Sequence, residues 1–534
     1  MTFQVTTTDL AGRIGMLTTK HGTIETPALL PVVHPTRQNL PPHEIRGMGF
    51  DGVMTNAYLA LKYARDPAVE RGIHALIGFD GVIMTDSGGY QILEYGDVEA
   101  TPEEVASFEA AIGTDIATIL DRPTGFNATR EYARQTVEDT VAAAKRSLDS
   151  EARHQTLWMG PIQGGKYLDL LRASARQMRR LRFDLYALGS PTEVMESYQF
   201  PLLAQMIHAV KTVLPLSKPL HLFGAGHPLT LPLAVALGCD TFDSASYALY
   251  AREGRYLTGS GTRRLEKLTY LPCVCPICQA TTVQELRSGE ESPKQLARHN
   301  LWVLRHEMIA VKQAIREGRL WEYLGIKARC HPKLWEAYQL LGKFHTLLED
   351  GTPAFKDRSP FLFNPVDAQR PEVSRARRRI AENLRIDSAV HVVFPEQEEK
   401  PYSRSLLYGE LVARLGNLGK QVQIFFLIPA LGPVPAEVGD VYPFPQCLYP
   451  TGFAENREVA QVTLKQATKL LRRSGRILIV DGFPRHVVLM GKLQKRLRGS
   501  LLARLASTLS VGDAADRVAG HVKRILEDTE AVPS

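Results

Sequence analysis

The sequence contains no apolar run approaching the roughly 20 residues that a membrane-spanning helix needs. Its opening, MTFQVTTTDLAGRIG, has neither the basic segment nor the apolar segment of a secretory signal peptide. Long low-complexity segments are also missing, so folded domains are expected throughout. These absences exclude an integral membrane protein and predict a cytoplasmic one.

Cysteine is scarce, with six residues in a chain of 534. Three of them fall within CVCPIC, a spacing that is poor for a disulfide framework and good for a metal ion. The other three are isolated, and we expect them to be buried apolar residues: Cys239, Cys330 and Cys447.

There is no acidic surplus, because 64 Lys and Arg residues outnumber 57 Asp and Glu residues and leave a formal charge of +7. Clustered cations bind phosphates by releasing counterions, so this balance permits a nucleic-acid partner. It does not require one, since solvated helix faces also carry such clusters.

Residues 52–261 repeat one unit, in which an apolar run is followed by a polar or Gly-rich turn and a helical pattern. Eight such runs are present, from DGVMTNAY through GVIMTDSGGY, DIATILDRPTG, LWMGPIQGG, DLYALGSP, PLHLFGAGHP and CDTFDSAS to RYLTGSG. Continuous apolar strands that alternate with helices indicate a parallel sheet covered on both faces. The pattern predicts an α/β fold, a (β/α)8 TIM barrel, with a doubly wound open sheet as the alternative.

Polar residues stand at the carboxyl ends of these runs. The carboxyl ends of parallel barrel strands meet at one mouth, where active sites lie. Burying several carboxylates there without a purpose would cost free energy, whereas a helix cap explains only one of them. The residues in question are Asn56, Asp86, Asp121, Gln163, Gly189, Gly226 and Asp243.

The domain organisation follows from composition. Residues 1–350 are expected to form the barrel domain, which includes a metal-binding subdomain at about 270–305 and a helical extension. The Pro-rich segment 351–372 is expected to be a linker. Residues 373–534 contain the strand-like runs HVVFP, QVQIFFLIPAL and RILIVDGFP, which predict a smaller α/β accessory domain.

A tetrahedral zinc site is the strongest local prediction. Three thiolates, from Cys273, Cys275 and Cys278, and one imidazole would complete a closed Cys3His site with a structural role. His299 is preferred as the fourth ligand because HNL opens a helical segment that can fold back on the cysteines. His306 is its competitor.

Five motifs, in order and spacing, resemble the tRNA-guanine transglycosylase family: TDSGGYQILEYGD, PIQGG, HLFGAGHP, FDSASYALYAREGR, and CVCPIC with a downstream HNL. The segments DSGGYQILEYGDVE, ILDRPT and HLFGAGHP are similar to the sequences of the archaeal branch of the family. The resemblance covers about residues 12–348. It implies exchange of a guanine at position 15, in the D-loop of tRNA, for 7-cyano-7-deazaguanine (preQ0), in archaeosine biosynthesis.

The resemblance assigns two catalytic carboxylates. Asp243 in FDSAS matches the nucleophile that forms a covalent ribosyl intermediate, and Asp86 in DSGGYQ matches the general acid/base. Base exchange without net hydrolysis needs such a pair, as in retaining glycoside hydrolysis. From the sequence alone Asp240 competes with Asp243, although its place before Phe242 puts it below the mouth.

Most of the remaining site residues are also implied by the resemblance. Asp121 and Gln163 with Gly164 would read the edges of the base, and the backbone of Leu188 and Gly189 would contact its substituent. Asn56, from its place in MTNAY and not from the resemblance, would either orient a carboxylate or the ribose or cap a turn. Tyr90 would stack on the base where the family usually has phenylalanine, Ser87 and the glycines after it would allow a close backbone approach, and Arg252 would contact RNA.

The expected partners are tRNA, the preQ0 base and one structural zinc ion. Family members often dimerise through the barrel and zinc regions, so a homodimer is a further expectation. No clear PUA domain precedes residue 534, and a separate PUA-domain protein would then clamp the tRNA. Two alternatives stay open: a transglycosylase that acts on DNA, and a non-catalytic subunit of a split enzyme.

Overall fold

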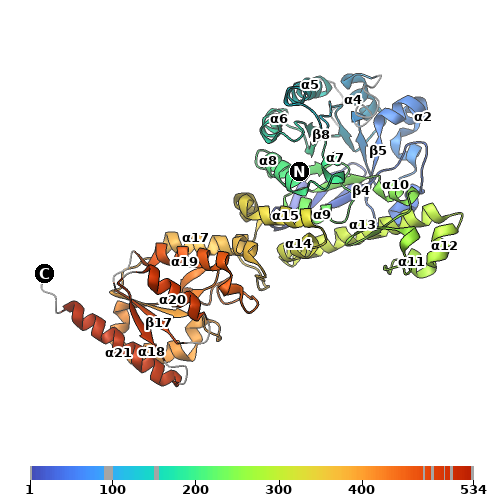
Figure 1. Ribbon diagram of the computed structural model, residues 1–534. Coiled ribbons are helices and arrows are strands. Elements are labelled where there is room, and N and C mark those ends of the chain that lie inside the picture. The colour runs from blue at the N-terminus through green and yellow to red at the C-terminus, as the bar shows by residue number, and fades with distance from the viewer. Residues whose placement is uncertain are drawn as a thin grey trace. The chain divides into compact units, whose positions relative to one another are not determined.

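The computed structural model describes residues 3–89, 100–148, 156–472, 476–482, 486–497, 499–505 and 509–530. The chain divides into two compact units, Met1–Pro353 and Ala354–Ser534 (Figure 1). The first unit contains the polar residues that the sequence places at the ends of apolar strands.

The first unit is built on an eight-stranded parallel sheet in the order β4-β11-β10-β9-β8-β7-β6-β5. A parallel bridge between Val32 and Met54 brings the two outer strands together, so the sheet is a nearly closed barrel, as predicted. The strands are β4 (Ala28–Pro31), β5 (Gly52–Asn56), β6 (Val82–Asp86), β7 (Ile116–Thr118), β8 (Leu157–Ile162), β9 (Leu185–Leu188), β10 (Leu220–Leu222) and β11 (Thr241–Ser244).

Helices surround this barrel because each strand is followed by a segment with an apolar face. Helix α4 shows how such a segment begins: the Thr101 hydroxyl and the Glu104 carboxylate form a capping box. The helices are α1 (Pro42–Gly47), α2 (Ala57–Ile77), α4 (Pro102–Ala111), α5 (Arg130–Leu148), α6 (Leu168–Arg180), α7 (Thr192–Glu196), α8 (Phe200–Lys211), α9 (Thr230–Ala236) and α10 (Ser246–Arg252).

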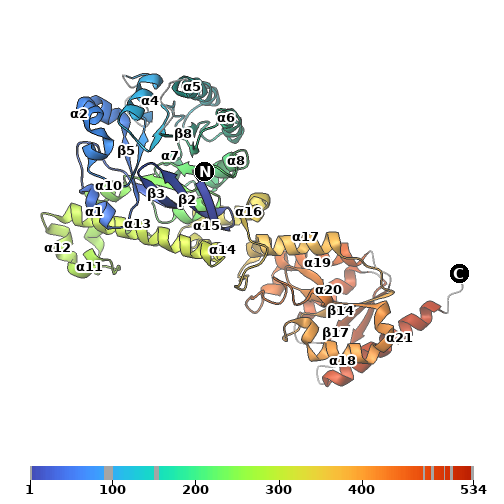
Figure 2. The ribbon, with the colours of Figure 1, turned by 180° about the vertical axis from the view of Figure 1, so that it is seen from behind.

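A small antiparallel sheet precedes the barrel and covers its amino-terminal end. It consists of β1 (Phe3–Asp9), β2 (Gly12–Thr19) and β3 (Gly22–Thr26) (Figure 2). Leu17 and Ile24 of this sheet belong to the same buried cluster as Met54, Met84 and Met159 of the barrel strands. Only the other end of the barrel is therefore left for a site at the strand termini.

One of the eight predicted strands is wrong. The run RYLTGSG does not join the barrel but forms an antiparallel pair from β12 (Arg255–Thr258) and β13 (Gly261–Arg264). The missing barrel strand is β4, upstream of the repeated region. It was overlooked because it has only four residues, ends in proline and has no long helix after it.

A helical region follows the two-stranded pair. It runs through η2 (Leu265–Lys267), α11 (Pro276–Ala280), α12 (Val283–Ser288), α13 (Ser292–Arg316), α14 (Leu320–Ala328), α15 (Pro332–Leu340), η3 (Leu341–Phe344) and α16 (His345–Gly351). The buried face of α13 carries Leu296, His299, Val303 and Glu307, at three- and four-residue steps.

The second unit contains a five-stranded sheet in the order β16-β15-β14-β17-β18, parallel except for β16. A mixed α/β sheet is therefore present, as predicted. Its elements are η4 (Pro365–Gln369), α17 (Pro371–Asn383), β14 (Val390–Pro395), η5 (Tyr402–Arg404), α18 (Leu406–Leu415), η6 (Gly416–Gln421), β15 (Val422–Ile428), β16 (Gly432–Pro435), η7 (Ala436–Val438), η8 (Phe453–Glu455), α19 (Arg457–Leu471), β17 (Arg476–Asp481), α20 (Val487–Arg496), β18 (Leu501–Arg504) and α21 (Val511–Glu530).

The segment expected as a linker, residues 351–372, places Leu362 and Ala368 in the core of the second unit.

Of the isolated cysteines, Cys239 and Cys447 are buried, but Cys330 is exposed, which corrects its expected burial. It follows helix α14, in a turn that leaves the side chain in solvent. No helix among the described residues is long and apolar enough to cross a bilayer.

Candidate active site

The carboxyl end of β6 supplies the first functional carboxylate, Asp86. The register pairs Asp86 with Asn56 at the end of β5, and the Asn56 amide donates to Asp86 Oδ2 at 2.9 Å. The side-chain oxygen Oδ1 of Asn56 accepts a hydrogen bond from the backbone amide of Leu59 and caps helix α2. The orientation of the Asn56 side chain is therefore fixed. Asn56 thus holds one oxygen of Asp86 while its own position is set by the helix.

The electrostatic surroundings of Asp86 favour its protonated form. Burial, followed by the charges of Asp121 and Asp243, raises the pKa of this carboxyl to about 7, against smaller opposing effects of hydrogen bonds. The charges of Asp121 and Asp243 therefore act on Asp86. A carboxyl with a pKa near 7 can give and take a proton at neutral pH.

The second carboxylate, Asp121, lies three residues after β7 and is held by a polar network. The Gln163 amide donates to Asp121 Oδ2 at 2.5 Å, while Gln163 Oε1 accepts from the amide of Thr124 at 3.1 Å and from the hydroxyl of Ser190 at 3.0 Å. Burial raises the pKa of Asp121 to about 6, although the bond from Gln163 opposes this. The network leaves Asp121 Oδ1 facing Gly89.

The third carboxylate, Asp243, belongs to β11. Its Oδ1 accepts a hydrogen bond from the amide of Gly224 at 2.8 Å and lies 3.1 Å from His221 Nε2. The fully buried His221 contacts the Thr241 hydroxyl through Nδ1 at 3.0 Å. When Thr241 donates to Nδ1, the imidazole proton is on Nε2 and points at Asp243. One carboxylate oxygen is thus fixed by two donors.

A fourth acid, Glu109 of α4, lies behind the mouth. Its Oε1 accepts from the Thr85 hydroxyl at 2.6 Å and from the Thr118 amide at 3.3 Å. Burial raises the pKa of Glu109 well above its usual range, and the charge of Asp86 raises it further. A protonated Glu109 adds no negative charge beneath Asp86, so the raised pKa of Asp86 comes first from burial and then from the charges of Asp121 and Asp243.

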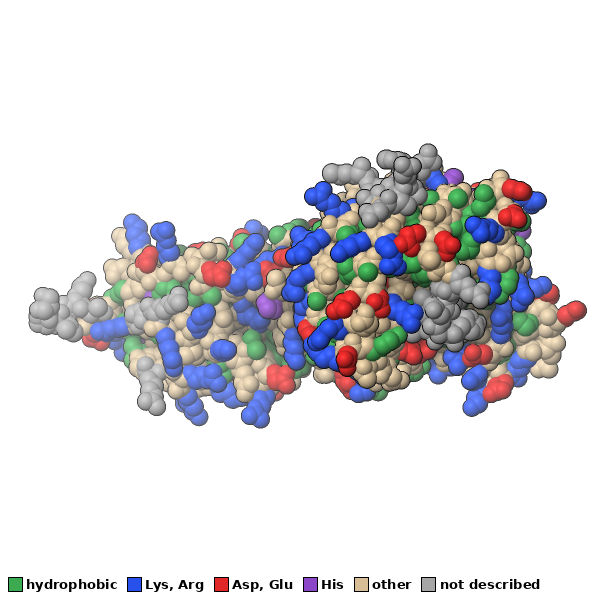
Figure 3. Space-filling model, turned by 90° about the horizontal axis from the view of Figure 1, so that it is seen from above, with side chains coloured by type: hydrophobic (Ala, Val, Ile, Leu, Met, Phe, Trp, Pro, Cys, Tyr) green, Lys and Arg blue, Asp and Glu red, His purple; other side chains and the backbone are tan. Residues whose placement is uncertain are grey.

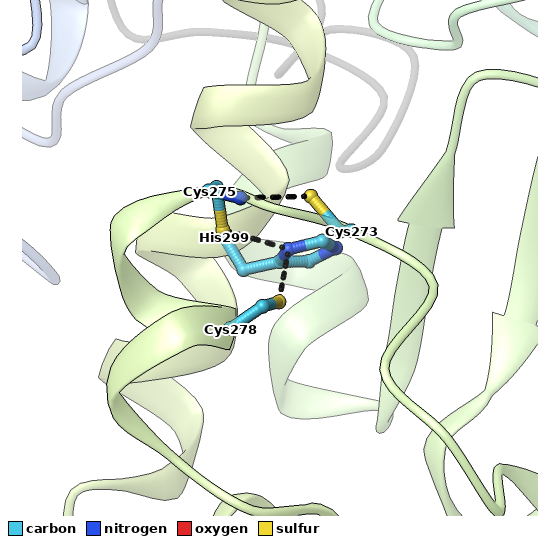
Figure 4. A group of neighbouring side chains, drawn as sticks. All are labelled: Cys273, Cys275, Cys278 and His299. Carbon is cyan, nitrogen blue, oxygen red and sulfur yellow. Dashed lines mark hydrogen bonds between the residues drawn. The ribbon is translucent and has the colours of Figure 1, made fainter.

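Three cysteines and a histidine form a compact group after the barrel. Cys275 Sγ and Cys278 Sγ lie 3.4 and 3.3 Å from His299 Nδ1, and Cys273 Sγ accepts from the Cys275 amide at 3.4 Å. Figure 4 shows the four side chains pointing toward one another between the cysteine loop and helix α13. This group can hold a metal ion. His306 is exposed and is not part of it.

The histidine of this group is held from its other side. His299 Nε2 lies 2.9 Å from the Leu257 carbonyl, and the Tyr256 ring stacks on the imidazole at 3.7 Å between centroids. A proton on Nε2 leaves the lone pair of Nδ1 for a metal ion, which is the arrangement expected of a ligating histidine. The donor set therefore fits zinc in its Cys3His form.

The family model for queuine tRNA-ribosyltransferase matches residues 9–333, more than half of the chain. The chain belongs to this family. Relatives that carry the name tRNA-guanine(15) transglycosylase include those of Pyrobaculum aerophilum (46% identical, over 84% of this chain and 90% of the relative) and Aeropyrum pernix (40% identical, over 93% and 96%). That of Methanocaldococcus jannaschii is 41% identical, over 86% of this chain and 70% of the relative.

Within this queuine tRNA-ribosyltransferase fold, several predicted binding residues lie at the strand ends. Leu188 ends β9 and is fully buried, and the Gly164 amide donates to the Thr124 hydroxyl at 3.1 Å. A Cβ on Gly189 would lie 2.3 Å from Gln163 Nε2, so only glycine lets the two approach.

The other predicted contacts are placed differently. The buried Ser87 hydroxyl donates to the Ile119 carbonyl at 3.1 Å, so it ties β6 to the end of β7. Arg252 is exposed at the end of α10 and donates to the Asn39 side chain at 2.5 Å. Tyr90 lies outside the described residues.

Sequence reasoning gave no role to three residues that orient this site: His221, Thr124 and Ser190. His221 had a signal, because it is the polar residue between Leu220 and Leu222 in a strand that is otherwise apolar. Thr124 and Ser190 lie in loops, where sequence periodicity predicts no contact. Asp240, the competitor of Asp243, pairs with Arg13 at the amino-terminal end of β11.

Proposed function

We propose that this chain exchanges guanine 15 of tRNA for the free base 7-cyano-7-deazaguanine, by way of a covalent bond between the ribose and Asp243. The relatives from Pyrobaculum aerophilum and Aeropyrum pernix, which this chain covers over 90% and 96% of their length, carry the name tRNA-guanine(15) transglycosylase. The observation that carries the proposal is the group of three carboxylates at the carboxyl ends of three strands, in which Asp121 and Asp243 raise the pKa of Asp86.

The first half of the reaction removes guanine. An oxygen of Asp243 attacks C1′ of the ribose, the bond from C1′ to N9 breaks, and its electron pair goes to the purine. Asp86 gives its proton to the departing guanine and becomes a carboxylate. Since the hydrogen bonds from His221 and Gly224 fix Oδ1, we assign the attack to Asp243 Oδ2.

The second half reverses these steps with the new base. Asp86 takes the N9 proton of the incoming deazaguanine, N9 bonds to C1′, and Asp243 leaves as a carboxylate. Protons balance over the cycle, because Asp86 ends as it began. The covalent intermediate keeps the ribose activated until the second base arrives, which separates exchange from hydrolysis.

Base recognition is assigned to the polar network around Asp121. A carboxylate accepts hydrogen bonds from the amino and ring N–H donors of a guanine edge. The Gln163 side chain donates to Asp121 and lies against the backbone of Gly189. Gly164, Leu188, Ser87, Asn56 and Tyr90 remain proposed contacts of the base or ribose, with Arg252 for RNA. Figure 3 shows Lys and Arg side chains interspersed with Asp and Glu side chains on the part of the surface that it draws.

Zinc is the ion we propose for Cys273, Cys275, Cys278 and His299. It would supply a structural crosslink between the cysteine loop and helix α13, and it has no part in the exchange. A second copy of this chain and a separate PUA-domain protein remain proposed partners for tRNA binding.

The direct test of this function is incorporation of labelled preQ0 by the purified chain. We expect label in tRNA transcripts with guanine at position 15 and none in transcripts with adenine there. Duplex DNA serves as the second acceptor. Label in DNA and not in tRNA would show that the substrate is DNA. If the chain labels neither polymer alone and a second protein restores exchange, the chain is a subunit of a split enzyme.

A further inference from the structure

A second group of metal-ligating side chains lies at the amino-terminal end of the barrel, away from both sites described above. It consists of His21, His74 and Asp115. His21 lies in the turn between β2 and β3, His74 in the last turns of α2, and Asp115 directly before β7. The active-site acids lie at or just after the carboxyl ends of their strands, so this group lies at the opposite end of the barrel.

The three side chains converge on the Asp115 carboxylate. His21 Nδ1 lies 2.9 Å from Oδ1, and His74 Nε2 lies 3.0 Å from Oδ2. One ligand atom from each residue can be chosen so that all three lie within 4.8 Å of one another. A tetrahedral ion with bonds of about 2.1 Å keeps its ligand atoms about 3.4 Å apart, so small side-chain rotations would enclose an ion.

The carboxylate is held in place independently of the histidines. The amide of Ile83 donates to Asp115 Oδ2 at 2.9 Å, and the amide of His21 donates to Oδ1 at 3.2 Å. The Asp115 side chain is fully buried, whereas the His21 side chain is 42% exposed. Metal ligands oriented by such surrounding donors lose less entropy on binding.

Space for further ligands adjoins the group. A cavity of about 510 Å³ is lined by His74, Arg46, Phe79 and Asp80, among others. Water can therefore reach the side of His74, and a closed Cys3His site offers no such open position. Two imidazoles and one carboxylate with open positions form a donor set for divalent transition ions.

We propose that His21, His74 and Asp115 form a second metal site, which binds a divalent ion of the zinc, nickel or cobalt class with water completing its coordination. The ion would join the β2–β3 turn to α2 and to the start of β7. Since Leu17 and Ile24 of the same hairpin pack into the barrel core, a crosslink at the turn would hold the hairpin on the barrel. The site is independent of the proposed exchange reaction.

The test is a titration of the full-length chain, without an affinity tag, in metal-free buffer after one molar equivalent of zinc has been added to fill the Cys3His site. NiCl₂ is added in a calorimeter to the wild type and to the His21→Ala, His74→Ala and His345→Ala variants. His345 is an exposed histidine outside the group and serves as the matched control. The wild type and the control should bind one Ni²⁺ beyond the zinc already present, and the other two variants at least about tenfold more weakly.

Two further readouts separate this site from the cysteines and from misfolding. Co²⁺ added to the zinc-loaded chain should give a spectrum without thiolate charge transfer. Ni²⁺ should raise the Tm of the wild type and of His345→Ala but not of His21→Ala, whose exposed side chain can be removed without disturbing the core. Absence of an additional ion in the wild type, or equal binding by His21→Ala and His345→Ala, would overturn the proposal.

Discussion

At the amino-terminal end of the barrel, the carboxylates of Asp240 and Asp115 pair with Arg13 and with two histidines, whereas at the carboxyl end the charges of Asp121 and Asp243 act on Asp86. Asp240 pairs with Arg13, whose Nε lies 2.8 Å from Oδ1, and Leu220 donates its amide to the same carboxylate. Burial alone would raise the pKa of Asp115, but hydrogen bonds from His74, the Ile83 amide and His21 lower it. The pKa values of Asp86 and Asp121 are raised instead.

Within one sheet, the carboxylates at one end thus serve stability and those at the other end serve the reaction. Satisfied carboxylates at the amino-terminal end hold the strands in register, and their removal should cost stability. Carboxylates that repel one another at the mouth cost stability and gain proton-transfer ability, and their removal should cost activity. The predictions below test that contrast, from the largest expected effect to the smallest.

Asp243→Ala should lower exchange by at least about 10⁴-fold, because loss of a nucleophile removes the covalent route. Initial rates of labelled guanine incorporation into tRNA measure this effect. A cooperative unfolding transition of the variant should show that it is folded, so that the loss of exchange is not a loss of structure. A variant that exchanges at the wild-type rate would exclude Asp243 as the nucleophile.

Arg13→Met should lower the free energy of unfolding by about 3–5 kcal/mol, because it leaves Asp240 buried without its guanidinium partner. Its exchange rate should be unchanged at temperatures where the variant is folded. The matched control is Arg130→Met, which breaks an exposed pair with Asp169 and should cost far less stability than Arg13→Met. Equal losses in denaturant unfolding for the two variants would remove the distinction between the barrel ends.

Asp86→Asn should lower exchange by about 10²-fold or more, since an amide cannot carry the proton between the two bases. It should also change the pH dependence of stability. With a folded pKa of about 7 against an ordinary value of 3.8, wild-type Asp86 retains a proton that the unfolded chain has released. Between pH 4 and 7 the wild type therefore loses stability as pH rises, by up to about 1.4 kcal/mol for each pH unit.

That pH effect is measured by denaturant unfolding of both proteins at pH 5 and pH 7. The variant should be more stable relative to the wild type at pH 7 than at pH 5. An unchanged difference would mean that Asp86 titrates at its ordinary value and that the mouth does not raise its pKa.

His221→Gln should lower exchange about tenfold while leaving the KM for preQ0 unchanged, because His221 orients Asp243 without touching the base. The split between kcat and KM in steady-state kinetics checks this positioning role. A rise in KM alone would instead place His221 in base binding.

The sequence predicted the barrel because its strands are buried on both faces and read as continuous apolar runs. It misplaced one strand, since four residues ending in proline carry too little pattern to separate β4 from a loop. The Cys3His group was predictable because three of its ligands lie close together in the sequence, within CVCPIC. His221 and the His21, His74 and Asp115 group were not, because their partners are joined only by folding.

The central claim is the covalent bond between the ribose and Asp243, and mapping that bond tests it most directly. The chain is incubated with tRNA in the absence of preQ0, denatured, and digested with nuclease and protease for mass spectrometry. We expect a ribosyl adduct on the peptide that contains Asp243, and its loss on addition of preQ0. An adduct on another residue, or exchange with no adduct at any time, would contradict the account.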